Sequence, residues 1–257
     1  MKHRGQVNMF IIAGITVIVI IVLLLFYKGK LLPELDVGKE KNPNMFFESC
    51  VEGKVKEAIS IMSLQGGYIK PKFKISFKFE DRDFEEIPYL CYTKNYYVPC
   101  VNQEPMLIQH LNEEIKDYVK EDVEDCFNKY ILELENANYV VDSSYEGFEV
   151  KLVPGRILVN IYGKITSTKT GETSKQENFG VRIPTKFYDL GIVVQEIVSQ
   201  EAEYCNFDIL GFMMLYSDFE IDKFRTGESI TIYRLKHKDS KEEFQFAVRS
   251  CVIPPGI

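Results

Sequence analysis

The sequence predicts an α+β protein in which an apolar N-terminal segment precedes a folded domain. Residues 9–27 contain no charged side chain. Beyond residue 43, helical stripes with three- and four-residue spacing recur, and runs of alternating apolar and polar residues lie between them. Of the 257 residues, 46% are hydrophobic and 13% are aromatic, which is enough for a packed core. We expect amphipathic helices packed on antiparallel sheets.

Residues 9–27, MFIIAGITVIVIIVLLLFY, predict a transmembrane helix. At the helical rise of about 1.5 Å per residue they span about 30 Å, the thickness of the hydrocarbon core of a bilayer. A cleaved secretory signal would have a shorter apolar core and a small-residue cleavage motif. A buried soluble helix would rarely be apolar on every face over this length. We expect a single span that anchors the chain in the lipid bilayer, with residues 1–8 as a short basic N-terminus.

The orientation of this anchor follows from the cysteines, because basic residues flank both of its ends and the positive-inside rule does not discriminate. All six cysteines follow the span, and none lies in a C-x-x-C motif or at zinc-ligand spacing from a histidine. Such a set predicts disulfides and a C-terminal domain outside the cell membrane. The alternative is a set of buried cytosolic thiols, which pack as small hydrophobic side chains.

One cysteine pair has a geometric argument. Residues 87–101 predict a hairpin in which Cys91 and Cys100 are equidistant from a two-residue turn at residues 95–96. The remaining pairs that we expect are Cys50–Cys126 and Cys205–Cys251. Since six cysteines allow about 15 connectivities, spacing alone does not select these two pairs.

The predicted hairpin is also rich in tyrosine: Tyr89, Tyr92, Tyr96 and Tyr97. These side chains predict either a contact surface for an envelope protein or glycan partner, or a half-buried sheet face, because tyrosine is a common strand residue.

The first part of the folded domain reads as helix, hairpin, helix. Residues 28–43 predict a linker, and a helix follows from Asn44, as its N-cap, to a glycine pair at residues 66–67. Residues 72–79 alternate as a strand. A second helix begins at Pro105, carries an acidic outer face typical of a solvated surface, and ends near residue 128. This first unit covers residues 44–135.

The second unit covers residues 136–257 and reads as sheet and helix. Short strands are predicted in this order: 139–141, 148–153, 157–165 and 179–183. Thr185 caps a third helix that reaches Cys205, and strands close the chain. Periodicity leaves residues 207–216 open between helix and strand. Whether the two units share one core is also left open.

The sequence contains no motif typical of a catalytic or metal-binding site. The histidines are at positions 3, 110 and 237; His110 has no companion at ligand spacing, and His237 lies in a charged turn where we expect it to face solvent. No nucleophile elbow, H-E-x-x-H motif or Walker loop is present. A net charge of -7 disfavours nucleic acid as a partner. We expect no cofactor, no metal site and a non-enzymatic function, with a membrane-tethered enzyme built on a carboxylate pair as an alternative.

The basic N-terminus has a resemblance of its own. KHRGQ ahead of a long apolar helix resembles the class III signal peptides of archaeal type IV pilins. The resemblance implies cleavage between Gly5 and Gln6 and a pilin-like surface filament subunit. That family usually has Glu at the fifth mature position, where this sequence has Phe10. The alternative is the ordinary basic flank of a signal anchor.

A second resemblance covers most of the chain. It is carried by an ordered set of short motifs: Arg4-Gly5-Gln6, Glu48-Ser49-Cys50, Leu64-Gln65-Gly66-Gly67-Tyr68-Ile69, Ile87-Pro88-Tyr89 and Phe244-Gln245-Phe246-Ala247-Val248-Arg249. Together they resemble uncharacterised single-pass surface proteins of small-genome (DPANN-type) archaea. The resemblance implies a membrane-anchored, exported domain and supplies no catalytic residue. The sequence therefore predicts an anchored extracytoplasmic module for envelope binding or assembly.

Overall fold

The computed structural model describes residues 17–20, 42–80 and 83–254. Residues 17–20 are helical, but the rest of the predicted anchor over 9–27 lies outside the described residues. Within the described part, no helix is long and apolar enough to cross a bilayer. The predicted processing site at Gly5 and Gln6 also lies outside the described residues, as do residues 28–41 of the predicted linker.

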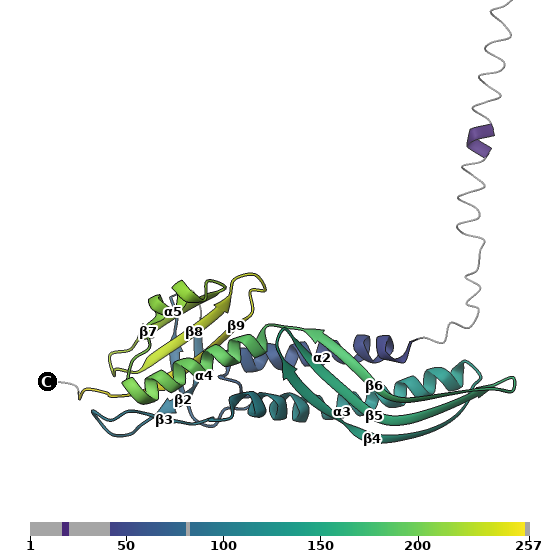
Figure 1. The fold of residues 1–257 in the computed structure, drawn as a ribbon, viewed down its shortest axis with the longest axis horizontal. Coiled ribbons are helices and arrows are strands. Elements are labelled where there is room, and N and C mark those ends of the chain that lie inside the picture. Colours follow the sequence, from purple (N-terminus) through teal and green to yellow (C-terminus); the bar gives the residue numbers. More distant parts are fainter. Residues whose placement is uncertain (1–16, 21–41, 81–82, 255–257) are drawn as a thin grey trace, which may run out of the picture. The chain divides into compact units, whose positions relative to one another are not determined.

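The chain from Pro43 onward forms one compact unit with an α+β fold, as predicted (Figure 1). Its elements are, in chain order, α2 (Pro43–Leu64), β1 (Lys74–Lys78), β2 (Phe84–Tyr92), β3 (Val101–Asn102), α3 (Leu107–Asn136), β4 (Val140–Val153), β5 (Arg156–Lys169), β6 (Glu172–Pro184), α4 (Phe187–Tyr204), α5 (Ile209–Leu215), β7 (Phe219–Arg225), β8 (Thr231–His237) and β9 (Glu243–Arg249).

The larger sheet has the strand order β1-β2-β9-β8-β7, with β3 paired to β2. The neighbours β2 and β9 are parallel, and the other neighbouring pairs are antiparallel. In the central strand β9, Phe244 and Phe246 are buried, and so are Gln245 and Ala247, which alternate with them. A strand buried on both faces needs cover on both sides of the sheet. One face packs with α4, and the other holds a smaller cluster around Phe79, Ile87, Tyr89 and Ile232.

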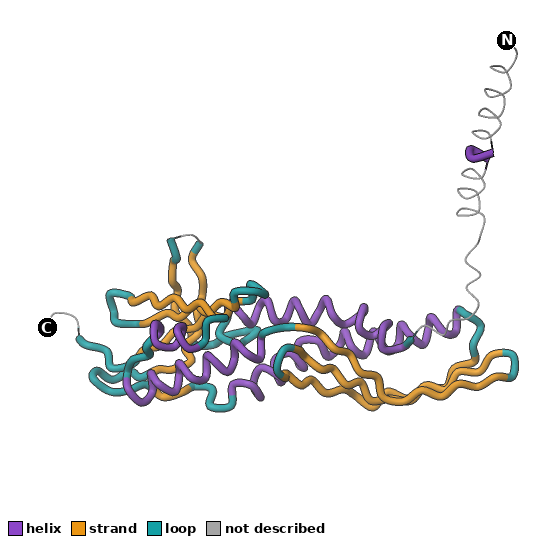
Figure 2. Tube along the Cα trace, turned by 45° about the horizontal axis from the view of Figure 1, so that its top comes forward, coloured by secondary structure: helices purple, strands orange, loops and turns teal. Residues whose placement is uncertain are grey.

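The smaller sheet is an antiparallel meander, β4-β5-β6, that curves along α2 and α3 (Figures 1 and 2). Its buried side chains alternate along the strands, as expected for a sheet with one covered face. The ring of Phe47 on α2 lies 4.9 Å from that of Phe179 on β6. One core cluster includes residues of both sheets and of α2, α3 and α4. This core extends across residue 135, where the sequence pattern divides the domain.

Several predicted boundaries were wrong. The second helix continues to Asn136 instead of ending near residue 128, because Tyr130 is buried in the core and residues 131–136 contain good helix formers. The first helix already includes Pro43 and Asn44, although Asn44 was the predicted N-cap, and the Asn44 side chain accepts a hydrogen bond from the Gly180 amide at 3.1 Å. The short strands predicted over 139–153 form one long strand, β4.

The predicted two-residue turn at residues 95–96 was also wrong. Strand β2 ends at Tyr92, and Cys91 lies opposite Asn102 on β3, so residues 93–100 form a longer loop. The loop still brings Cys91 to a Cα–Cα distance of 5.3 Å from Cys100, and the two are joined by a disulfide. The bridge therefore closes a loop rather than linking facing residues of a hairpin.

The structure has the disulfide connectivity preferred from the sequence. Besides Cys91–Cys100, the bridge Cys50–Cys126 joins α2 to α3 at a Cα–Cα distance of 6.0 Å. The bridge Cys205–Cys251 joins the end of α4 to the segment after β9 at 5.7 Å. No free cysteine is left in the described part of the chain. Three disulfides are consistent with a domain that folds in an oxidising compartment, such as the cell exterior.

The C-terminus of α2 shows why the Gly66–Gly67 pair ends the helix. Both residues have positive φ, 58° and 90°, and the Gly67 amide donates to the Met62 carbonyl at 2.8 Å. A Cβ on Gly67 would lie 2.7 Å from a methyl carbon of Leu111 on α3. The residue therefore combines a left-handed backbone with close helix packing.

We expect Gly67→Ala to lower the free energy of unfolding by about 1–3 kcal/mol, because alanine is strained at this φ and overlaps Leu111. The matched control is Gly53→Ala in the exposed middle of the same helix, where no atom lies within 4 Å of the added Cβ. This control should raise the free energy of unfolding by about 0.5–1 kcal/mol. The measurement is denaturant unfolding of the full chain in detergent micelles. Effects of the same sign would contradict this account.

Candidate binding cleft between helices α4 and α5

Two faces of helix α4 have different surroundings. The first, predicted from the sequence, buries Leu190, Val194 and Ile197 in the core. A second row at four-residue spacing faces a cleft instead and consists of Tyr188, Ile192, Glu196 and Gln200. Ile192 remains 42% exposed, which is unusual for an isoleucine on a helix that already packs with a sheet.

The segment that periodicity left open between helix and strand forms the short helix α5. Asp208 caps it: one carboxylate oxygen accepts hydrogen bonds from the amides of Leu210 and Gly211, each at 3.1 Å. The Met213 sulfur accepts from the Ile221 amide of β7 at 3.3 Å. A short helix has little stability of its own, so these two contacts and packing hold α5 against the sheet edge.

A cleft of about 920 Å³ lies between α4 and α5 and reaches β7 and β8. Its lining contains aromatic rings in unusual number: Tyr188, Phe207, Phe212, Tyr216, Phe219 and His237. It also contains the carboxylates Asp189, Glu196, Asp208 and Asp218. Apolar walls with a few polar groups are the usual composition of a ligand-binding pocket.

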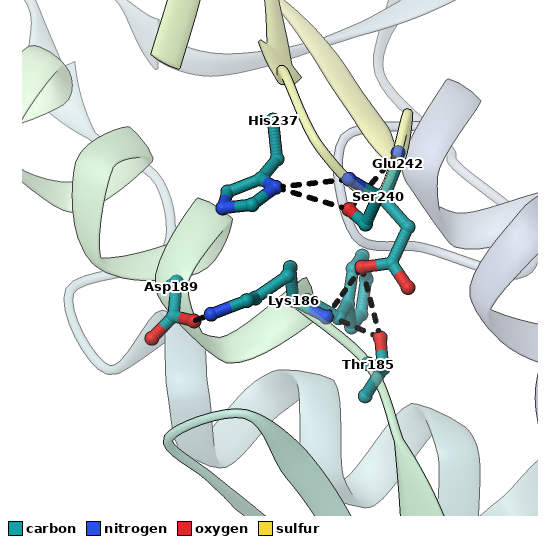
Figure 3. Close-up of polar contacts among 7 residues, drawn as sticks. Thr185, Lys186, Asp189, His237, Ser240 and Glu242 are labelled. Atoms are coloured by element: carbon teal, nitrogen blue, oxygen red, sulfur yellow. Dashed lines mark hydrogen bonds and ion pairs between the residues drawn. The ribbon is translucent and has the colours of Figure 1, made fainter. Parts of the chain in front are cut away.

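His237 contradicts the expectation that it faces solvent, because its side chain is buried with only 5% exposed. The ring packs edge-to-face with Phe219 at 5.6 Å. Its Nδ1 accepts a hydrogen bond from the Ser240 amide at 3.2 Å and lies 3.2 Å from the Ser240 hydroxyl (Figure 3). Because a backbone amide can only donate, this contact assigns the proton of the neutral ring to Nε2. Figure 3 shows Nε2 on the ring edge turned away from Ser240, and His237 is one of the residues that line the cleft.

Glu242 fixes the start of α4 to the β8–β9 hairpin. Its carboxylate accepts from the Thr185 hydroxyl at 3.1 Å and from the Lys186 amide (Figure 3). A carboxylate at this end of a helix is also favoured by the helix dipole. The predicted cap at Thr185 is one residue early: the N-cap of α4 is Lys186, and the Thr185 hydroxyl accepts from the Phe187 amide at 3.1 Å.

Several polar groups of the cleft pair with one another in the described part of the chain. Ser240 and His237 lack the carboxylate that orients the imidazole in a serine-hydrolase triad, since no carboxylate of the described chain hydrogen-bonds to Nε2. Asp189 pairs with Lys186 at 3.3 Å, and Glu196 accepts from Gln200 at 2.6 Å. No group of acidic, histidine or cysteine side chains in the described residues is suited to hold a metal ion.

The four predicted tyrosines do not form one surface. Tyr89 is buried and packs edge-to-face with the half-buried Tyr92 at 5.1 Å. The Arg249 guanidinium lies 5.7 Å from the Tyr92 ring and 5.6 Å from that of Tyr96. Tyr97 is exposed, with positive φ. The pair Tyr89–Tyr92 thus belongs to a sheet face, while Tyr96 and Tyr97 remain accessible.

His110 has companions that its sequence position does not reveal. Its ring lies 4.5 Å from that of Tyr68, and its Nδ1 lies 3.9 Å from a Glu104 carboxylate oxygen. The Tyr68 hydroxyl donates to Glu104 at 2.6 Å, and burial is the main cause that raises the pKa of this tyrosine. This cluster joins the segment after α2 to the start of α3.

A second polar cluster lies under the far end of α4. Glu201 is only 3% exposed, and its carboxylate accepts from the Tyr233 hydroxyl and lies 3.4 Å from the Lys223 ammonium. Burial raises the pKa of Tyr233, and the Glu201 charge raises it further. Sequence reasoning missed this cluster because its members come from a helix and two strands. The only local signal is a Glu on the apolar side of a helix.

No family model, curated protein or solved structure matches this chain.

Stability should fall at alkaline pH. Burial raises the pKa of Tyr89 to about 12 and shifts the pKa of Tyr68 and Tyr233 in the same direction. A phenol whose pKa is higher in the folded state than in the unfolded state, where it is near 10, stabilises the fold fully below the unfolded value. That contribution is lost as the pH rises above about 10.

Tyr233→Phe should therefore weaken the alkaline decline while costing about 1–3 kcal/mol at pH 7, because Glu201 loses a buried donor. The measurement is the free energy of unfolding of the full chain between pH 7 and pH 12. Leu235→Ala, a buried change on the same strand without a titrating group, controls for general destabilisation and should keep the wild-type slope. An unchanged slope in Tyr233→Phe would refute the assignment.

Proposed function

We propose that this chain is an extracytoplasmic binding module, anchored in the cell membrane through residues 9–27, and that the cleft between α4 and α5 is its binding site. The observation that carries the proposal is the cleft itself, about 920 Å³ with six aromatic rings and four carboxylates in its lining. Rings and apolar side chains left accessible beside polar groups are typical of interaction sites. The uncharged apolar segment and the three disulfides support the anchored, exported part of the proposal.

A binding function fits the cleft better than the carboxylate-enzyme alternative. Glycoside hydrolysis needs one carboxylic acid and one free carboxylate that face each other across the substrate. Here Asp189 has an ion pair with Lys186, and Asp208 is committed to the amides of α5. Two of the four carboxylates therefore already serve the fold.

The first test concerns location. In intact cells, a membrane-impermeant protease should remove a C-terminal tag, and all six cysteines should resist alkylation until the protein is reduced. Both results follow from an exported, oxidised domain behind a single span. N-terminal sequencing of the native chain belongs to the same experiment. A chain that begins at Gln6 would favour the pilin-like filament subunit, and a protected tag with free thiols would refute export.

The second test concerns the cleft. A photo-crosslinking amino acid at Ile192, which lines the cleft, should trap a partner in cells, while the same residue at the exposed Val140 of β4 should not. Ile192→Arg, which fills the cleft with a bulky charged side chain, should abolish function in any assay in which deletion of the chain has a phenotype. The Val140→Arg control should not. Equal crosslinking at both positions would exclude the cleft as the binding site.

A further inference from the structure

We propose that the occupant of the cleft is a short, basic and partly apolar peptide segment of a partner protein. The inference rests on the proposed binding function of the cleft and adds the chemical class of its ligand.

The charge of the cleft selects a cationic ligand. Four carboxylates line it against one lysine, Lys186, whose ammonium is already paired with Asp189 at 3.3 Å. The other three are Glu196, Asp208 and Asp218, and none has an ion pair with a basic side chain within the described ranges. A cleft lined by one sign of charge concentrates ligands of the opposite sign.

The rings and Leu215 select a ligand with both cationic and apolar parts. Phe212 and Tyr216 stack at 4.5 Å, and Tyr188 on the opposite helix lines the same cleft. Aromatic faces attract ammonium and guanidinium groups. Leu215, which also lines the cleft, is 80% exposed and offers an apolar contact to a ligand. Lysine or arginine beside leucine or phenylalanine matches this combination.

His237 favours a peptide over a simple amine as the ligand. The residue is 5% exposed, its Nδ1 is occupied by Ser240, and its Nε2, on the side of the ring away from Ser240, has no hydrogen-bond partner among the described residues. This N–H can therefore donate to a ligand that offers an acceptor. A peptide carbonyl supplies one at every residue, whereas a polyamine supplies none. The volume, within the range of about 300–1,000 Å³ for small-ligand pockets, limits the segment to a few residues.

The test uses the full chain in detergent micelles and a random octapeptide library. Bound peptides should be enriched in lysine or arginine together with leucine or phenylalanine. A fluorescent octapeptide of alternating Lys and Phe is then titrated by fluorescence anisotropy, with spermine as competitor. Spermine that competes as strongly as an unlabelled copy of the peptide would overturn the assignment to a peptide. Enrichment of neutral or acidic peptides would overturn the charge argument.

Matched variants locate the binding. Glu196→Gln combined with Asp218→Asn should weaken the octapeptide roughly ten-fold, and the loss should shrink at high salt. Glu121→Gln combined with Asp125→Asn removes the same charge from the exposed face of α3 and should leave affinity within about two-fold. Equal weakening by both pairs would show attraction to the whole acidic chain. If no peptide binds but the crosslink at Ile192 persists, the ligand class is wrong and the binding function stands; if both fail, both proposals fall.

Discussion

The cleft depends on one interaction, the Glu242 carboxylate at the N-terminus of α4. It accepts from Thr185 and from the Lys186 amide, and so joins the β8–β9 hairpin to the first turn of the helix. The same hairpin holds His237 through Ser240. One turn of six residues, 237–242, therefore sets both the position of a cleft wall and the orientation of the imidazole at the cleft end. Loss of this carboxylate would affect the helix and the hairpin together.

The far end of α4 is held by different means. Glu201 is tied to Tyr233 and Lys223 of the sheet, and the Cys205–Cys251 bridge closes the next turn. A helix fixed at both ends forms a rigid wall, and rigidity before binding lowers the entropy cost of association. The facing wall, α5, is short and rests on Asp208 and on one contact from Met213. The two walls of the cleft thus differ: α4 is fixed at both ends, whereas α5 is a short helix held by fewer contacts.

The sequence predicted correctly those features that depend on interactions between residues close together in the chain. Three correct predictions each depend on residues within a few positions of one another: the apolar stripe of α2, the Gly66–Gly67 stop and the alternation in β1. The predicted α+β class holds for the described chain, and the preferred disulfide connectivity is that of the structure. The end of α3 was missed because burial of Tyr130 against α2 decides it. The turn near residue 95 was missed because pairing of β2 with β9 sets where β2 ends.

The cleft was also missed because it depends on contacts between elements that are distant in the sequence. Its lining comes from α4, α5, β7 and β8, and only the apolar excess of residues 207–216 hinted at it.

The acidic residues of this chain show why charge alone does not define a site. The outer face of α3 carries exposed carboxylates such as Glu121 and Asp125, which water and salt screen well. Glu196 and Asp218 carry the same charge but line a recess together with aromatic rings and the imidazole of His237. Recessed charges between low-dielectric walls are screened less, and the rings and the imidazole add directional contacts that the α3 face lacks. The net charge of -7 attracts basic molecules in general. In the proposed binding mode, discrimination among them comes from the few positions where carboxylate, ring and His237 Nε2 act on one ligand.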